Sequence, residues 1–143
     1  MRHILTAALL ALALPANAAD GVVTYPTTDS FDDATFAVES AIIERGLVID
    51  HVSKVGDMLA RTKADVGGTK DLFDGANVYL FCSAQTSRKV MEADPMNIVH
   101  CPYGVFVADQ GGEVIIGYRD MPDGSMQPVE DLLDGIAREA AGQ

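Results

Sequence analysis

Two histidines are the strongest candidates in this sequence for binding a metal or another ligand. His51 closes a strand-like run, and His100 stands just before a cysteine and a proline. Imidazole nitrogen suits Zn²⁺, and imidazole together with thioether sulfur suits Cu(I) or haem iron. Met91 and Met96 precede His100 by a few positions and could supply the thioethers. These four residues therefore form a candidate ligand or metal site, with haem or copper as its cofactor.

A plainer interpretation of the same residues stays open. His51 could hydrogen-bond Asp50 or a backbone carbonyl, and His100 could simply line a loop. Met91 and Met96 could fill gaps in a core, which is a common use of methionine. The two histidines do not stand at the i, i+4 spacing of a helix, and the chain lacks Cys-x-x-Cys-His for covalent haem.

Cys82 and Cys101 are the only two cysteines of the chain. In an exported protein an even count of two favours one disulfide. Closing a loop of roughly 20 residues would stabilise the fold by about 3 kcal/mol. Two unpaired thiols, one of them filling the core, or a thiolate metal or redox site are the alternatives. A nucleophilic pair of either cysteine with a histidine is also conceivable, but a disulfide would abolish it.

Other residues offer little for enzyme chemistry, and no catalytic residue is assigned. The hydroxyls of Ser83, Thr86 and Ser87 lie in no Gly-x-Ser-x-Gly elbow. The glycine pair of residues 67–68 follows no predicted strand and reads as a loop instead of a phosphate cradle. An acidic segment near the C-terminus lacks the spacing of an EF-hand and could bind Ca²⁺ only weakly; its members are Asp120, Asp123, Glu130, Asp131 and Asp134.

The N-terminus has the form of a secretory signal peptide. A basic start at Arg2 precedes an apolar run over residues 4–14, which is too short to cross a bilayer. Small residues then place the cleavage after Ala18 or Ala19. The prediction is a signal peptide over residues 1–18 and a mature protein over 19–143 that is periplasmic or secreted. No membrane span is expected after the signal is removed.

Charge excludes two classes of partner. The chain carries a formal net charge of −11, and removal of Arg2 with the signal peptide makes the mature protein more acidic still. Binding to nucleic acid depends mainly on clustered lysine and arginine, so no nucleic-acid partner is expected. Docking on an anionic lipid surface is disfavoured for the same reason. The acidity could attract cations or basic partners, or serve solubility alone.

The pattern of apolar residues predicts one domain of alternating strands and helices. A helix over residues 31–45 has Ser30 as its cap and Gly46 as its end. Shorter helices are expected after Ser53 and within residues 83–94, the latter capped by Thr86 or Ser87, and a last helix begins at Gln127. Strands are expected at residues 21–27, 47–52, 77–82, 103–108 and 113–119, the last two joined as a hairpin. The predicted fold is α+β, with a mixed or antiparallel sheet of about five strands and helices on one face.

Several segments resemble, in order and spacing, the family called domain of unknown function 302. The resemblance extends from Tyr25 to Asp120 and is carried by Glu44-Arg45-Gly46-Leu47, Val48-Ile49-Asp50-His51, Val78-Tyr79-Leu80-Phe81, Pro102, Gly104-Val105-Phe106-Val107 and Gly117-Tyr118-Arg119-Asp120. It implies a small α+β fold that often forms homodimers, and no settled activity. Cys82-Ser83-Ala84 stands where the family usually has a Gly-Asn-Pro-like turn, and Cys101 stands where it usually has leucine. Because both departures are cysteines, they support a disulfide specific to this exported branch.

The leading functional prediction is an exported, non-catalytic domain that binds a small ligand or a protein partner. A periplasmic metal- or haem-binding protein that uses His51 and His100 is the alternative. A hydrolase or thiol enzyme is the third possibility.

Overall fold

The structure is a computed structural model that describes residues 17–19 and 21–143. The predicted signal peptide lies outside the described residues except for its last two positions. These two positions begin the first strand, β1 (Asn17–Ala19). Cleavage after Ala18 or Ala19 would therefore remove most or all of β1, which lies at one edge of the sheet.

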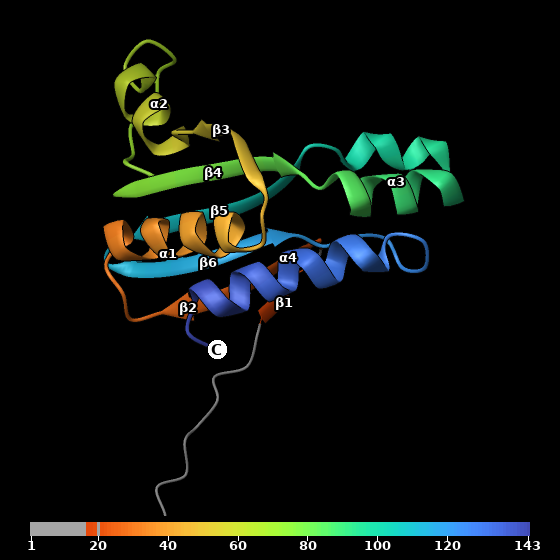
Figure 1. Cartoon of the computed structure of the whole chain (residues 1–143). Coiled ribbons are helices and arrows are strands. Elements are labelled where there is room, and N and C mark those ends of the chain that lie inside the picture. The colour runs from red at the N-terminus through yellow and green to blue at the C-terminus, as the bar shows by residue number, and fades with distance from the viewer. Residues whose placement is uncertain (1–16, 20) are drawn as a thin grey trace, which may run out of the picture.

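A single antiparallel sheet forms the centre of the described chain (Figure 1), and its strand order is β1-β2-β6-β5-β4-β3. Each described pair of neighbouring strands runs antiparallel, so of the two predicted arrangements the antiparallel one is found. The α+β prediction is confirmed, and five strands of six to eight residues make up the sheet beside the short β1. Those five are β2 (Val22–Thr27), β3 (Val48–Ser53), β4 (Gly75–Cys82), β5 (Tyr103–Gln110) and β6 (Glu113–Arg119).

Two long helices cover one face of this sheet and pack against each other: α1 (Phe31–Glu44) and α4 (Gln127–Ala140). The shorter α2 (Val55–Thr62) lies beside the β3–β4 edge, and α3 (Ala84–Ala93) extends past the end of the sheet. A 3₁₀ helix, η1 (Pro95–His100), connects α3 to β5. In the part of the chain that the structure describes, none of the helices is both long and apolar enough to cross a bilayer.

Local capping chemistry explains where the helices begin. Ser30 caps α1 as predicted, and its Oγ accepts from the backbone N–H of Asp33 at 3.1 Å. The cap of α3 is Ser83, whose Oγ accepts from the N–H of Thr86 at 3.2 Å, so the prediction of Thr86 or Ser87 is wrong. The helix starts earlier because β4 ends directly before Ser83. The short helix after Ser53 begins behind Lys54 without a side-chain cap.

The predicted hairpin between β5 and β6 is confirmed. Its two turn residues, Gly111 and Gly112, have φ values of 65° and 86°. Two consecutive positive φ values are typical of the type I′ turn, whose twist matches that of the strands. Carboxylates hold the turn, because Asp74 accepts from the N–H of Gly111 and Asp109 from that of Gly112.

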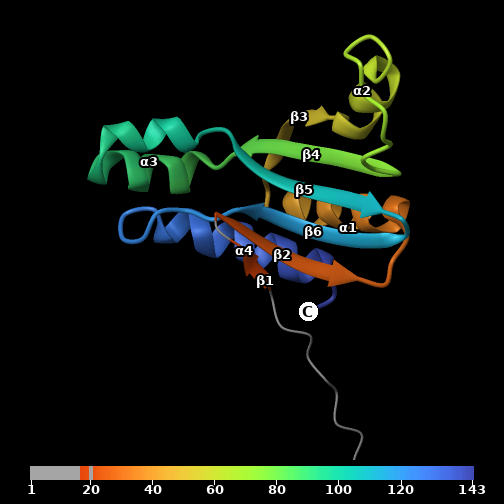
Figure 2. The same ribbon diagram turned by 180° about the vertical axis from the view of Figure 1, so that it is seen from behind.

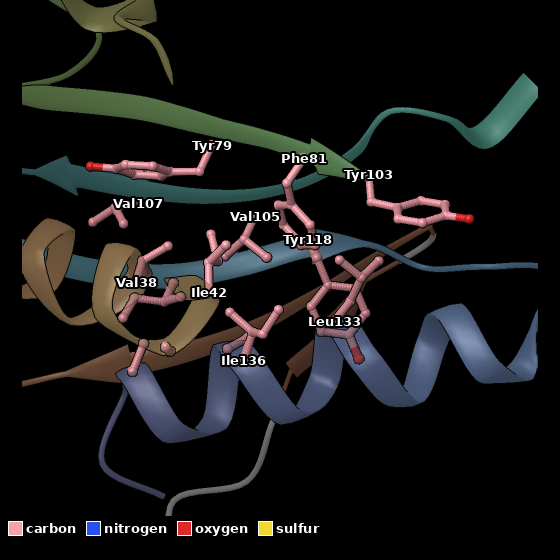
Figure 3. Close-up of a cluster of buried hydrophobic side chains, with 14 of the residues drawn as sticks. Val38, Ile42, Tyr79, Phe81, Tyr103, Val105, Val107, Tyr118, Leu133 and Ile136 are labelled. Atoms are coloured by element: carbon pink, nitrogen blue, oxygen red, sulfur yellow. The ribbon is translucent and has the colours of Figure 1, made fainter. Parts of the chain in front are cut away.

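The core lies between the sheet and the helix pair (Figure 3). Alternate residues of each strand point into it, as the period of two in a strand requires. The largest fully buried side chains belong to this face; they include Tyr25, Tyr79, Phe81, Tyr103, Ile116 and Tyr118 from the strands and Ile42, Leu133 and Ile136 from the helices.

The opposite face of the sheet is also apolar, although α1 and α4 do not cover it. Figure 2 shows this face, across which none of the described helices passes over β5, β6 and β2. Val78, Leu80, Phe106 and Ile115 lie on it and are half-buried. In the rest of the text this side is called the open face.

Candidate functional site

A hollow of about 390 Å³ lies on the open face, and we call it the sheet hollow. Residues far apart in the sequence form its wall because β2, β6, β5 and β4 are neighbours in the sheet. The lining consists of Gly21, Val22, Val78, Leu80, His100, Pro102, Gly104, Phe106, Arg119 and Met121.

Gly104 lines the sheet hollow, and Gly117 lies against the ring of Phe106, another lining residue. A Cβ atom on Gly117 would lie 2.6 Å from the Phe106 ring and 2.5 Å from a backbone oxygen of β2, so only glycine leaves room there. Gly117 stands opposite Phe106 in the register, and the ring therefore lies against bare backbone. A Cβ on Gly104 would come within 3.2 Å of Leu80. Gly104 therefore leaves the floor low between larger apolar side chains, and Gly117 leaves room for the Phe106 ring.

Of the described residues in the lining, only two have ionisable side chains. His100 is half-buried at the end of η1, and Arg119 is exposed at the end of β6. Among the described residues, no aspartate or glutamate lines the sheet hollow, although the chain has 21 acidic residues and 10 basic ones. Arg119 and His100 therefore give one end of the wall a positive charge and hydrogen-bond donors, with no carboxylate beside them among the described lining residues.

The other predicted ligand residues lie at different distances from the sheet hollow. His51 is exposed on the edge strand β3 and stands opposite Leu80 in the register, so it lies on the open face beside the hollow but not in its lining. Met91 packs against the core instead, and Met96 is 65% exposed on η1. Among the described residues, no group of three or more His, Cys, Asp or Glu side chains could hold a metal ion.

The two cysteines meet at the edge of the same site. Cys82 ends β4, and Cys101 stands between His100 and Pro102, both of which line the sheet hollow. The two Sγ atoms are 3.3 Å apart and are not bonded to each other in this structure. The two cysteines therefore lie close together, as the sequence suggested, while the disulfide itself stays a prediction.

The thiols are poorly suited to nucleophilic catalysis. Loss of water around the thiol, followed by its hydrogen bond with Cys101, raises the pKa of Cys82 to about 11, although the residue as a whole is exposed. A thiol with so high a pKa carries little thiolate at neutral pH, and thiolate is the nucleophile. In the described contacts each thiol lies next to the other, and Cys101 also lies 3.8 Å from Ser87 Oγ. Neither thiol is hydrogen-bonded to a histidine among these contacts.

Part of the acidic C-terminal segment has a structural role on the helix face of the sheet. Tyr25 and Tyr118 both donate to Oδ1 of Asp134, and Tyr118 also lies 2.8 Å from Oε1 of Glu130. Oε2 of Glu130 accepts from the backbone N–H of Met121, and Arg138 donates to Asp134 at 2.8 Å. We call these side chains the tyrosine–carboxylate network. It ties α4 to β2 and β6, which is a different use from the weak Ca²⁺ binding considered for Glu130 and Asp134.

The network predicts a loss of stability at alkaline pH. Burial, followed by the hydrogen bond to Asp134, raises the pKa of Tyr25 from 10.0 to about 12. Burial and the contact with Glu130 also raise the pKa of Tyr118. Since the folded state keeps these protons longer than the unfolded state, their contribution is full below pH 10 and is lost as pH rises through about 12. We expect urea unfolding to show a free energy that falls over this range, and less steeply in Tyr25→Phe. An equal slope in both proteins would contradict this assignment.

Sequence reasoning missed most of the wall of the sheet hollow. It singled out His100 as a ligand but not Arg119 or Phe106, because an isolated arginine at the end of a strand has no spacing pattern. One signal was available. Apolar residues occupy both odd-numbered and even-numbered positions of residues 77–82, which indicates that both faces of this strand lie against apolar groups.

Comparison with known proteins places the chain in a family of unknown activity. A solved structure titled as the crystal structure of an uncharacterized conserved protein DUF302 from Bacillus stearothermophilus has the same fold, with a TM-score of 0.67. The two chains are 14% identical, and the alignment covers 87% of this chain and 98% of the other. A search of curated proteins found no match. Residues 23–142 match the family described as "Domain of unknown function DUF302", and the protein belongs to that family.

Proposed function

We propose that the protein is an exported, non-catalytic binding domain whose sheet hollow takes up a small, largely apolar organic molecule. The observation that carries this proposal is the hollow itself, an apolar depression of about 390 Å³ with two polar groups in its wall. Ligand sites in proteins commonly measure about 300–1,000 Å³ and have a mainly apolar lining with a few polar groups.

The position of the hollow favours binding on a rigid surface. Its floor is made of residues from the middle of β4 and β5, which are paired on both sides within the sheet. Such a floor is preformed, so little conformational entropy is lost when a ligand is held there. A second depression, of about 330 Å³, lies between α2 and the loop of residues 66–73. Part of its wall is an exposed loop, and two of its charged residues, Lys63 and Asp71, are already paired with each other at 2.7 Å.

The chemistry of the described residues supports binding more than catalysis. The thiols of Cys82 and Cys101 face each other, and burial raises the pKa of Cys82. The hydroxyl of Ser87 is engaged with Tyr103 at 3.0 Å. Catalysis by a nucleophile needs a base within hydrogen-bond reach. The described contacts of these three side chains contain no such base.

Export is supported by the form of the N-terminal segment. A basic residue, an apolar run and small residues before Ala18 are the parts of a secretory signal. N-terminal sequencing of the protein recovered from the periplasm or medium should begin at Ala19 or Asp20. Recovery of the intact Met1 terminus would contradict export.

Filling the sheet hollow should abolish the binding of an apolar probe. We expect the neutral fluorophore N-phenyl-1-naphthylamine to bind the wild-type protein with enhanced emission. Val78→Trp should weaken this binding at least tenfold, about 1.4 kcal/mol, because indole would occupy the space of the ligand. The affinity is measured by fluorescence titration, and thermal unfolding followed by circular dichroism shows that the variant is folded.

A matched control is available on the next strand. Val48 is 72% exposed on β3 and is not in the lining of the hollow, so Val48→Trp should leave the affinity within twofold. Failure of the wild-type protein to bind the probe, or equal effects of the two substitutions, would overturn the proposed function.

Haem or copper binding is the second candidate, because His100 lines the hollow and His51 lies on the same face. If this candidate is right, haemin or copper should bind the purified protein at one equivalent, and His51→Ala and His100→Ala should each weaken that binding. Absorbance spectra and metal analysis measure it.

The homodimer implied by the family resemblance also stays a prediction, which light scattering of the purified protein tests.

A further inference from the structure

We propose that the ligand of the sheet hollow is a small amphipathic anion, with an apolar body and a carboxylate that is held by Arg119 and His100. This inference rests on the proposed function and names the chemical class of its ligand. It is carried by the placement of Arg119 and His100, the two ionisable groups among the described lining residues.

The first observation concerns charge. The protein is strongly acidic, with a formal net charge of −11, yet the described residues that line the hollow include an arginine and a histidine and no carboxylate. Asp120 follows Arg119 directly but lies outside the lining. A cationic ligand would meet only like charge or neutral groups in this wall. Complementarity of charge therefore selects an anion.

The second observation concerns the availability of Arg119. Four other cations are held in ion pairs of 2.7–2.8 Å, namely Arg45, Lys63, Arg88 and Arg138. Among the described residues no hydrogen bond or ion pair holds the guanidinium of Arg119. Because guanidinium presents two parallel N–H donors, it can bind both oxygens of a carboxylate.

The third observation concerns position. Arg119 stands opposite Val22 in the register of β2 and β6, and it comes two residues after Gly117, so it shares the open face with the floor of the hollow. His100 enters from η1, and its imidazole can donate one hydrogen bond in either protonation state. The apolar part of the wall includes Leu80 and Phe106. A ligand with one charged end and an apolar body fits this division.

The test compares two probes of equal chain length that differ in their charge. Octanoate and octanol are titrated against protein that carries bound N-phenyl-1-naphthylamine, and displacement of the fluorophore is measured. Wild-type protein should bind octanoate at least tenfold more tightly than octanol. Arg119→Gln should reduce this preference to less than threefold, and Arg119→Lys should retain part of it. The preference is the ratio of the octanoate and octanol affinities within one variant, so it does not depend on how tightly that variant binds the fluorophore.

A control arginine lies elsewhere on the surface. Arg88 is exposed on α3 and pairs with Glu92, so Arg88→Gln should keep the full preference for octanoate. Equal displacement by octanoate and octanol in the wild type, or an undiminished preference in Arg119→Gln, would overturn the inference while leaving the apolar site intact. Absence of fluorophore binding in the wild type would instead overturn the proposed function, and this inference with it.

Discussion

Replacing Cys82 and Cys101 together by serine is expected to lower the free energy of unfolding of the exported protein by about 3 kcal/mol. The two residues are 19 positions apart, and their Sγ atoms already lie 3.3 Å from each other. In an oxidising compartment the pair should pass two electrons and two protons to a disulfide oxidant and form one bond. A closed loop restricts the unfolded chain more than the folded one, and this difference stabilises the fold.

Urea unfolding with and without a reductant measures this effect. The reductant should destabilise the wild-type protein. It should leave the double serine variant unchanged, because that variant has no disulfide to reduce, and the variant therefore serves as the control. A count of free thiols under denaturing, non-reducing conditions should find none in the exported protein. Two titratable thiols per chain would show that the disulfide does not form.

The disulfide would also act on the proposed ligand site. Cys101 lies between His100 and Pro102, both of which line the sheet hollow. A bond to the end of β4 would fix this short segment where η1 passes into β5. We therefore expect the oxidised protein to show slower amide exchange at residues 100–104 than the reduced protein.

Asp134→Ala should lower the free energy of unfolding by about 2–3 kcal/mol, more than the loss of any other carboxylate in the tyrosine–carboxylate network. Its carboxylate accepts from Tyr25, Tyr118 and Arg138, and its removal leaves the fully buried Tyr25 ring with an unpaired hydroxyl. Leaving a buried donor unsatisfied costs more than the hydrogen bond itself contributes. Urea unfolding measures the loss.

The matched control lies on the same helix. Asp131 is exposed and accepts only from Gln127, one turn earlier, in the described contacts. Asp131→Ala should therefore change the free energy of unfolding by less than about 0.5 kcal/mol. Similar losses in the two variants would show that α4 is held by its apolar side chains alone.

Acidic pH should reproduce part of the Asp134→Ala effect. Burial by itself would raise the pKa of this carboxyl, but hydrogen bonds from Tyr25, Arg138 and Tyr118 outweigh burial and lower it below the ordinary aspartate value. A carboxyl whose pKa is lowered on folding stabilises the fold above its unfolded pKa and loses that contribution as pH falls through the lowered value. The variant should lack this part of the acid dependence.

The local elements were predictable because short-range rules specify them. Ser30 at the start of α1 and Gly46 after its end are a cap and a left-handed stop, and both act within one turn of helix. The two glycines between β5 and β6 specify their turn in the same way. The cap of α3 was misplaced because Ser83 directly follows the last strand residue, where a strand pattern and a cap compete for the same positions.

The open face was harder to predict. Val78 and Leu80 indicated a strand that is buried on both sides, but helices were expected on only one face of the sheet. Nothing in a strand pattern distinguishes a face that is covered by helices from one that forms a hollow. The role of Gly117 was also hidden, because it depends on the Phe106 ring of the neighbouring strand.

By itself the sequence determined the element types, the α+β class, the family resemblance and the pairing expected of the two cysteines. These follow from interactions between residues that are close in the chain, or from counts of residue types. Only the tertiary structure decided that Arg119 and His100 share one hollow and that Met91 belongs to the core. The reason for the shared hollow is strand register, since the pairing of Val105 with Tyr118 places the start of β5, which follows His100, beside the end of β6, which carries Arg119.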